Sequence, residues 1–374
     1  MKAARCRNYL IVLAGLLLPC RAWGAGGDDL QACVRRFEGR GYEEAQACLA
    51  AYVARRPADT AALSYLGRAC LKRRQAEPAI DWLSKAVTRE PGRSDLHDWL
   101  GQAYGLAAQR AGTLRQFGLA SKVHKEFERA VELDPANPDA LADLIEFQIE
   151  APGLLGGSLE KAKAHAAELE RRDPLRGRLA RAAILLHQAA GFAAAERELQ
   201  ATAASFPRDS RPQLALAGAY EQAKHYERAL DALEAVLRLD PDNDDAHQAF
   251  ARIAASSGQR LPRAEELLTS YLGRVPPGDS AALADGQYAL ASVLERKGDA
   301  ARARGHYQEA LRRDPGFAEA RDALARVSHA RPSRGAANGP GCKAREGWTP
   351  EAYSKYVEEV QPSATQQTGS FPAP

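Results

Sequence analysis

Proline recurs along most of this chain at intervals close to 34 residues. Twelve residues before each recurring proline, seven of eight positions hold alanine, and Val123 is the exception. Eight residues before each proline, seven of eight positions hold a large side chain, and Ala166 is the exception. A spacing of four places two side chains on one helix face, and proline stops a helix, so the pattern predicts a series of helices with one apolar stripe each. The recurring prolines are Pro57, Pro91, Pro135, Pro174, Pro207, Pro241, Pro276 and Pro315.

A second pattern lies upstream of the clearest copies and predicts a partner helix. In each copy a large residue is followed by a small one and then by another large residue three positions later. The small residue lets two helices approach closely, so the two patterns together predict a helix hairpin of about 34 residues. The copies are Leu66-Gly67 with Cys70, Leu100-Gly101 with Tyr104, Leu216-Ala217 with Tyr220, and Leu290-Ala291 with Leu294.

This repeated hairpin resembles the tetratricopeptide repeat. The resemblance covers roughly residues 26–317 and is clearest at 60–93, 210–243 and 284–317. It implies an all-α, right-handed α-solenoid of about eight helix hairpins over residues 25–330, in which stacking supplies the core and the first helices line a concave groove. We expect Phe317–His329 to form a capping helix. The repeats leave no room for a separate catalytic domain, so we do not expect an enzyme.

The two ends of the chain differ from the repeats. Residues 1–24 show the three-part pattern of a secretory signal peptide, with basic residues, an apolar run and small residues before a cleavage site near Gly24. We therefore expect export to the periplasm or the cell exterior; an uncleaved anchor or a lipidated Cys20 are the alternatives. Composition predicts a flexible linker at 331–347, a short helix at 348–360 and a disordered tail at 361–374.

Charge and hydropathy exclude two classes of protein. The first 24 residues carry four basic and no acidic residues, which leaves 47 basic and 48 acidic residues in the remainder. This balance argues against a nucleic-acid partner, because such proteins need many cations to neutralise phosphates. No apolar stretch reaches the roughly 20 residues of a membrane-spanning helix, so we expect no transmembrane segment in the mature chain.

The repeat is interrupted at two adjacent places. The third copy carries ten extra residues between its helices, within 105–121, and the fourth carries five, within 150–158. Turns of this kind emerge on one edge of a solenoid, so the two insertions should be neighbours, and insertions on one face often bind partners. The alternative is a tolerated loop, because added loop length costs little entropy. The candidate residues of the second insertion are Pro152, Gly153, Leu154, Leu155, Gly156 and Gly157.

The tetratricopeptide resemblance also implies which side chains face the groove. We expect Arg68, Lys72, Asp95, Asp98, Gln102, Asp139, Glu146 and Glu150 there, followed by a mixed set in later repeats: His187, Glu221, Arg252, Tyr288, Glu295 and Arg296. The middle of the groove is therefore acidic and should attract a basic protein or peptide.

These residues favour a non-catalytic interaction scaffold of a bacterial cell envelope. The alternative is an accessory subunit of an envelope enzyme or a minor hydrolase that uses Glu146 and Glu150, which requires a carboxyl with a raised pKa. A lipid or glycan carrier would need an apolar groove instead. The sequence leaves the oligomeric state open.

Cysteine and histidine spacing predicts one disulfide and no cofactor or metal. Cys33 and Cys48 lie symmetrically about the turn at 39–41, so we expect a disulfide across the first hairpin, with two buried thiols as the alternative. No Cys/His cluster or paired-histidine motif has the spacing of a metal site. His97 and His247 occupy core positions, where packing explains them.

Overall fold

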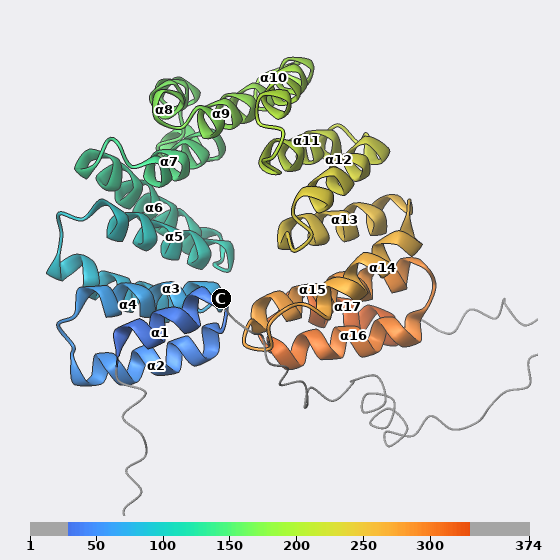
Figure 1. Cartoon of the computed structure of the whole chain (residues 1–374), viewed down its shortest axis with the longest axis horizontal. Helices are drawn as coiled ribbons and strands as arrows, with labels where there is room; N and C mark the ends of the chain where they lie inside the picture. The colour runs from blue at the N-terminus through green and yellow to red at the C-terminus, as the bar shows by residue number, and fades with distance from the viewer. Residues whose placement is uncertain (1–28, 330–374) are drawn as a thin grey trace, which may run out of the picture. The chain divides into compact units, whose positions relative to one another are not determined.

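The computed structural model describes residues 29–329, which form one unit of 17 α-helices and one 3-10 helix without any strand (Figure 1). The helices are α1 (Leu30–Glu38), α2 (Tyr42–Arg55), α3 (Thr60–Lys72), α4 (Ala76–Arg89), α5 (Ser94–Gln109), α6 (Thr113–Leu133), α7 (Pro138–Glu150), η1 (Gly153–Leu155), α8 (Leu159–Arg172), α9 (Pro174–Leu186), α10 (Phe192–Ser205), α11 (Arg211–Gln222), α12 (Tyr226–Leu239), α13 (Asp244–Ser257), α14 (Leu261–Leu272), α15 (Ser280–Arg296), α16 (Ala300–Arg313) and α17 (Ala318–His329).

Successive helices pair into eight hairpins, α1–α2 through α15–α16, and α17 packs on the last of them. Each hairpin packs on the next, which confirms the all-α solenoid that the sequence predicts. The odd-numbered helices lie toward the inside of the arc, as Figure 1 shows for α9, α11 and α13. The expected signal peptide, linker, short helix and tail lie outside the described residues. Among residues 29–329, no helix combines the length and apolar character needed to cross a membrane.

The recurring prolines lie between helices, with one informative exception. Seven follow the second helix of a hairpin, as expected. Pro174 is instead the first residue of α9, where its missing N–H costs no helical hydrogen bond. Asp173 both ends α8 and caps α9 by accepting from the Arg176 N–H. This shared residue leaves α8 and α9 joined by a single residue.

The two predicted apolar columns are buried in every repeat. The first helix of a hairpin needs a small residue where it faces the large side chains of the second helix. A Cβ on Gly67 would lie 2.5 Å from Leu83 Cγ, and one on Gly101 would lie 2.5 Å from Phe127 Cε1. Side-chain volume is therefore matched across each hairpin, as close packing demands. The buried columns are Ala45, Ala79, Val123, Ala162, Ala195, Ala229, Ala264 and Ala303, and Leu49, Leu83, Phe127, Ala166, Leu199, Leu233, Leu268 and Tyr307.

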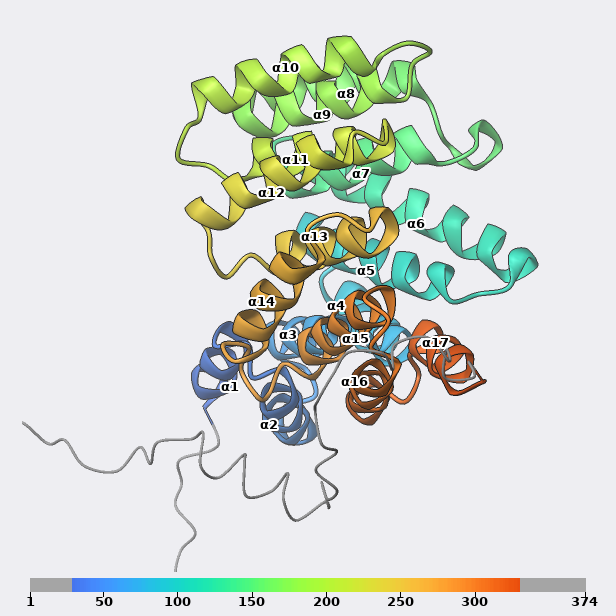
Figure 2. The ribbon, with the colours of Figure 1, turned by 90° about the vertical axis from the view of Figure 1, so that its right-hand side faces the viewer.

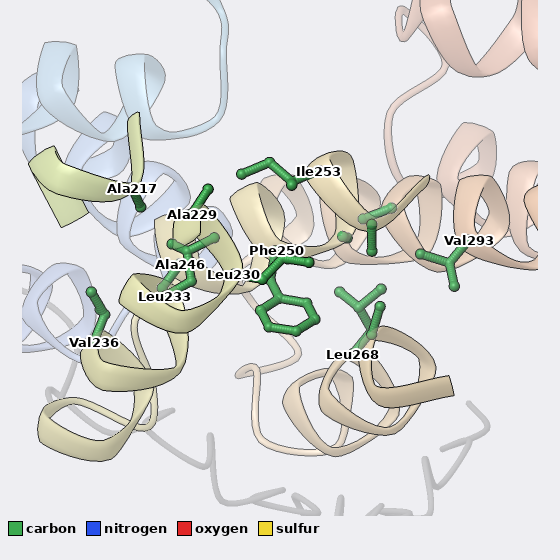
Figure 3. Packing of buried hydrophobic residues seen from close by; sticks show 14 of the residues in the cluster. Ala217, Ala229, Leu230, Leu233, Val236, Ala246, Phe250, Ile253, Leu268 and Val293 are labelled. Atoms are coloured by element: carbon green, nitrogen blue, oxygen red, sulfur yellow. The ribbon is translucent and has the colours of Figure 1, made fainter. Parts of the chain in front are cut away.

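The core is continuous over the second half of the described chain and divided over its middle. One cluster runs from α9 to α17, and Figure 3 shows Phe250 within it, with Leu230 and Leu268 nearby. Helices α4 to α9 instead contribute to several small clusters. The division falls where the repeat spacing is interrupted.

A covalent bond closes the first hairpin. Cys33 on α1 and Cys48 on α2 form a disulfide across the turn, in the pairing that their symmetric spacing predicts. Cys70 is a buried free thiol in the next hairpin, and burial raises its pKa to about 11. A thiol in this environment is protonated and unreactive at neutral pH.

The first two hairpins also touch the last repeats through polar side chains. In the α1–α2 turn, Arg40 Nε and Nη2 donate to Asp279 Oδ2 at 2.9 and 2.8 Å, and Nη2 also pairs with Asp244. In the α3–α4 turn, Arg74 pairs with Asp285 of α15, and its guanidinium lies 5.9 Å from the Phe317 ring centroid. We call these interactions the closing contact. They join residues more than 200 positions apart in sequence.

Candidate functional site

The ten extra residues of the third hairpin do not form the separate segment that we expected between two helices. They lengthen α5 and α6 instead, and only residues 110–112 remain between the two helices. The physical reason is that the inserted residues carry their own apolar positions at helical spacing, since Ala107 and Leu119 bury against Ala76 of α4. The expectation that ten extra residues lie between the two helices was therefore wrong.

The second insertion forms η1 and packs against α6. Gly156 has a left-handed φ of +102°, and a Cβ there would lie 2.5 Å from the His124 ring. The His124 ring in turn stacks on Phe147 of α7, with 5.3 Å between centroids. The η1 segment and the lengthened α5–α6 hairpin are therefore neighbours, as the sequence predicts, and Figure 2 shows both projecting from one edge of the stack.

Helix α7 presents a row of carboxylates beside these insertions. Asp139, Asp143, Glu146 and Glu150 follow one another at spacings of four, three and four, which places them on one helix face. Asp143 was not among the residues that we singled out, although this spacing identifies it. Partial desolvation, together with the charges of Asp143 and Glu150, raises the pKa of Glu146.

Asp143 of this row forms a coupled pair of carboxyls with Asp98 of the neighbouring helix α5. Asp98 of α5 is 3% exposed, and Gln102 Nε2 donates to Asp98 Oδ2 at 3.3 Å and to Asp143 Oδ2 at 2.8 Å. Burial, followed by the charges of Asp143 and Asp139, raises the pKa of Asp98 to about 8. Burial also raises the pKa of Asp143. At neutral pH the pair holds one proton for much of the time, so it carries less than two negative charges.

Several of the other predicted groove residues have partners within the chain. Arg68 packs over the Phe37, Tyr65 and Trp99 rings. The remaining acidic residues of the set pair with arginines: Asp95 with Arg93, Asp139 with Arg176, Glu221 with Arg252, and Glu295 with Arg326.

Four of the predicted residues have other surroundings. His187 bonds the Ala183 carbonyl oxygen, and Tyr288 packs on Tyr307 and Phe317. Lys72 is exposed, and Arg296 lies near Gly258. Within residues 29–329, Glu146 and Glu150 form no ion pair. Of the exposed acidic residues in the predicted set, Glu146 and Glu150 are therefore the two without a cationic partner among the described residues.

A pocket of about 720 Å³ joins this charge to the insertions. It opens between α5, α6, α7 and the segment that leads into η1. Its volume is within the usual range for ligand pockets. The structure thus brings Gln102, Glu146, Glu150, Pro152 and Leu155 to one site, whereas Gly153, Leu154, Gly156 and Gly157 adjoin it without lining it. The lining side chains that argue for binding are Leu106, Phe117, Phe147, Asp143, Glu146 and Glu150.

The histidines at core positions are explained by packing. His97 Nδ1 lies 2.6 Å from Glu126 Oε2, and His247 Nε2 lies 2.9 Å from the Pro241 carbonyl oxygen. His247 also stacks on Tyr271. In the part of the chain that the structure describes, no group of three or more His, Cys, Asp and Glu side chains could hold a metal ion.

Comparisons with known proteins identify the repeats. Tetratricopeptide repeat families match residues 30–94, 210–253 and 283–327. A search of the curated proteins found no match to this chain. The crystal structure of yeast Tom70 is similar over 77% of this chain and 58% of its own, with 12% identity and a TM-score of 0.53, which supports the fold.

Two bacterial tetratricopeptide repeat structures are more distant in shape. A thermophilic protein of Thermus thermophilus is matched over 96% of its length and 60% of this chain, with 18% identity and a TM-score of 0.41. A protein of Parabacteroides merdae is matched over 97% of its length and 80% of this chain, with 12% identity and a TM-score of 0.42. Taken with the repeated helix hairpins and their two buried columns, the matched segments show that this chain contains tetratricopeptide repeats.

Proposed function

We propose that this chain is a non-catalytic scaffold of the bacterial cell envelope that binds protein or peptide segments at the acidic part of its concave face. The observation that carries the proposal is the meeting of the unpaired carboxylates of α7 with both insertions at one pocket. A tetratricopeptide solenoid supports such a role, because stacked hairpins create an extended concave binding surface. Negative charge that the chain itself leaves unneutralised favours a basic partner.

Two features support a location in the envelope, either the periplasm or the cell exterior. Residues 1–24 have the pattern of a signal peptide, and Cys33 and Cys48 form a disulfide of the kind that persists in oxidising compartments. Cell fractionation followed by mass measurement tests this location. The proposal predicts a mature chain that starts near residue 25 in the envelope fraction, and a full-length chain in the cytoplasm would contradict it.

The alternative is an envelope hydrolase or an accessory subunit of one. Acid–base chemistry needs a carboxyl with a raised pKa in contact with the substrate. Asp98 has the raised pKa, but it is 3% exposed and lies beneath Gln102. Glu146 and Glu150 reach the pocket, yet neither forms an ion pair or hydrogen bond with a second catalytic group among the described residues. Cleavage of a captured partner by the wild-type chain, but not by Glu146→Gln or Glu150→Gln, would favour the hydrolase.

Capture of partners from an envelope extract tests the scaffold proposal. The wild-type chain and the variant Glu146→Lys/Glu150→Lys serve as baits for crosslinking and mass spectrometry. Asp98 is left unchanged because a lysine at this buried position would disrupt packing. A matched control, Glu319→Lys/Asp322→Lys, makes the same charge change on the exposed face of α17.

The scaffold proposal predicts a protein that the wild-type and control baits capture and the α7 variant loses. Equal capture by all three baits would place the partner elsewhere on the solenoid. Capture of no protein by the wild-type bait would contradict the scaffold role.

A further inference from the structure

The pocket between α5, α6, α7 and η1 has a composition that specifies its occupant. Resting on the proposed scaffold function, we propose that this pocket binds a cationic amphipathic segment of another protein, in which lysine or arginine side chains lie beside large apolar ones. Helices α5 and α6 line it with large apolar side chains and three glutamines, which form the apolar wall, and α7 lines it with three carboxylates beside Phe147. An occupant must satisfy both walls at once, since a desolvated charge without a partner is costly.

The apolar wall comes from the insertions and extends beyond the pocket. Phe117 is 47% exposed and lines the pocket, although it is a large aromatic side chain. Four large hydrophobic side chains are exposed among the described residues, and three of them, Leu114, Phe117 and Leu154, belong to the two insertions. Leu114 lies one helical turn before Phe117, and Leu154 adjoins the lining residue Leu155. Exposed apolar groups gathered on one edge mark an interaction site.

The acidic wall is a row on one face of α7. Asp143, Glu146 and Glu150 line the pocket over a rise of about 10 Å along the helix axis, at 1.5 Å per residue. Among the lining residues there is no lysine or arginine. A helical partner with cations at positions i, i+3 or i+4, and i+7 would present charges with the same rise, and its leucine or phenylalanine side chains would face Phe117 and Phe147.

Other classes of occupant fit this pocket less well. An anionic segment, a nucleic acid or an anionic membrane surface would be repelled by the carboxylates. A neutral apolar segment would desolvate Glu146 and Glu150 without replacing their water contacts. A hydrophilic basic segment would leave Phe117 and the neighbouring leucines exposed. Only the combination of cations and apolar side chains satisfies both walls.

Fluorescence anisotropy with a model peptide tests the proposal. The probe is an 18-residue, fluorescein-labelled helical peptide of Leu, Ala and Lys, with its lysines at i, i+3 and i+7 beside a leucine row. Two control peptides carry Glu in place of Lys, or Ser in place of Leu. The protein is the full chain, and each variant is checked for unchanged helix content by circular dichroism.

We expect the Leu–Lys peptide to bind in a salt-sensitive manner and both control peptides to bind weakly. Glu146→Gln/Glu150→Gln should weaken binding of the Leu–Lys peptide about tenfold, because two charge-assisted contacts are lost. Phe117→Ser should weaken it to a similar extent through the apolar wall. The matched control Glu319→Gln/Asp322→Asn should leave the affinity within about twofold, since surface pairs away from a site contribute little.

Three results would overturn the inference: binding of the Glu peptide as tight as that of the Lys peptide, binding of the Ser peptide as tight as that of the Leu peptide, or equal losses in the site and control variants. The outcome is separable from that of the scaffold proposal. A partner that the wild-type bait captures and that Phe117→Ser still retains would refute the pocket and preserve the scaffold. Peptide binding without capture of any protein would preserve the pocket and refute the scaffold.

Discussion

Removal of the Arg40 side chain should release the closing contact between the first hairpin and the last repeats. The guanidinium donates twice to Asp279 and pairs with Asp244. The Asp279 side chain is 5% exposed, so Arg40→Ala leaves an almost buried carboxylate without its cation. Asp279 still caps α15 by accepting from the Ala282 N–H, which keeps part of its hydrogen bonding.

The size of the effect follows from burial. Breaking a fully buried ion pair by removing one partner costs ~3–5 kcal/mol, whereas an exposed pair contributes ~1 kcal/mol or less. The side chains of Arg40 and Asp244 are about one-third exposed, at 32% and 29%, so solvent screens much of the interaction. We therefore expect a loss of about 2 kcal/mol in the closing contact, which corresponds to about a 30-fold increase in its opening equilibrium.

Hydrogen exchange followed by mass spectrometry measures this opening directly. Amides at 40–44 and at 278–283 should exchange about 30-fold faster in Arg40→Ala, while amides in α9–α11 stay unchanged. The matched control is Arg35→Ala, because Arg35 is an exposed arginine of α1 and forms no ion pair in the described structure. Unchanged exchange in Arg40→Ala, or an equal effect in Arg35→Ala, would refute the reasoning.

Three further predictions concern titration, covalent closure and packing. The pKa of Asp98 is raised from its ordinary acidic value to about 8, so the folded state binds a proton that the unfolded state releases. The free energy of unfolding should therefore fall as pH rises from about 4 through 8. In urea unfolding, Asp98→Asn should flatten this dependence and be more stable than wild type at pH 9. Cys33→Ser should destabilise the first hairpin by about 3 kcal/mol, as the loss of a 15-residue closed loop implies, and exchange in α1–α2 should then become insensitive to reductant. Gly101→Ala should destabilise the chain by ~1–3 kcal/mol because its Cβ would meet Phe127, and Phe127→Leu should recover part of that loss in thermal melts.

The repeated part of the fold could be predicted from sequence because each hairpin solves the same packing problem. Ala45 and Leu49 in the first copy, and Ala303 and Tyr307 in the last, occupy equivalent buried positions. Local spacing alone determines such positions, since a solenoid hairpin packs only on its neighbours. The helix that contains Ala318–His329 was predictable for the same reason.

The candidate site was predictable in part. That the two insertions are neighbours follows from a rule of solenoids: the turns between the two helices of each hairpin emerge on one edge of the stack. The lengthening of α5 and α6 was missed because the ten extra residues were placed between the two helices. Ala107 follows Ala103, and Leu119 precedes Val123, at the helical spacing of four. Pairing of Asp139 with Arg176 could not be predicted, because Arg176 comes from a different repeat and its position depends on the tertiary arrangement.

The closing contact had no sequence signal. Arg40 and Arg74 both lie in turns at positive φ, at 61° and 57°, where their side chains project away from their own hairpins. A Cβ on Gly278 would lie 2.9 Å from Gly41 Cα, so two glycines permit the close approach of the turns. Repeat periodicity describes contacts between neighbours only, and this contact joins the first copy to the last.

The most direct test of the proposed binding site is a hydrogen-exchange map of the full chain bound to a partner captured from the envelope extract. We predict protection that is concentrated at residues 102–127 and 143–155, where the lengthened α5–α6 hairpin, the α7 carboxylates and η1 meet. We predict no change in α11–α14, whose groove charges are neutralised within the chain. Protection centred on α11–α14, with residues 102–127 and 143–155 unchanged, would contradict this assignment of the site.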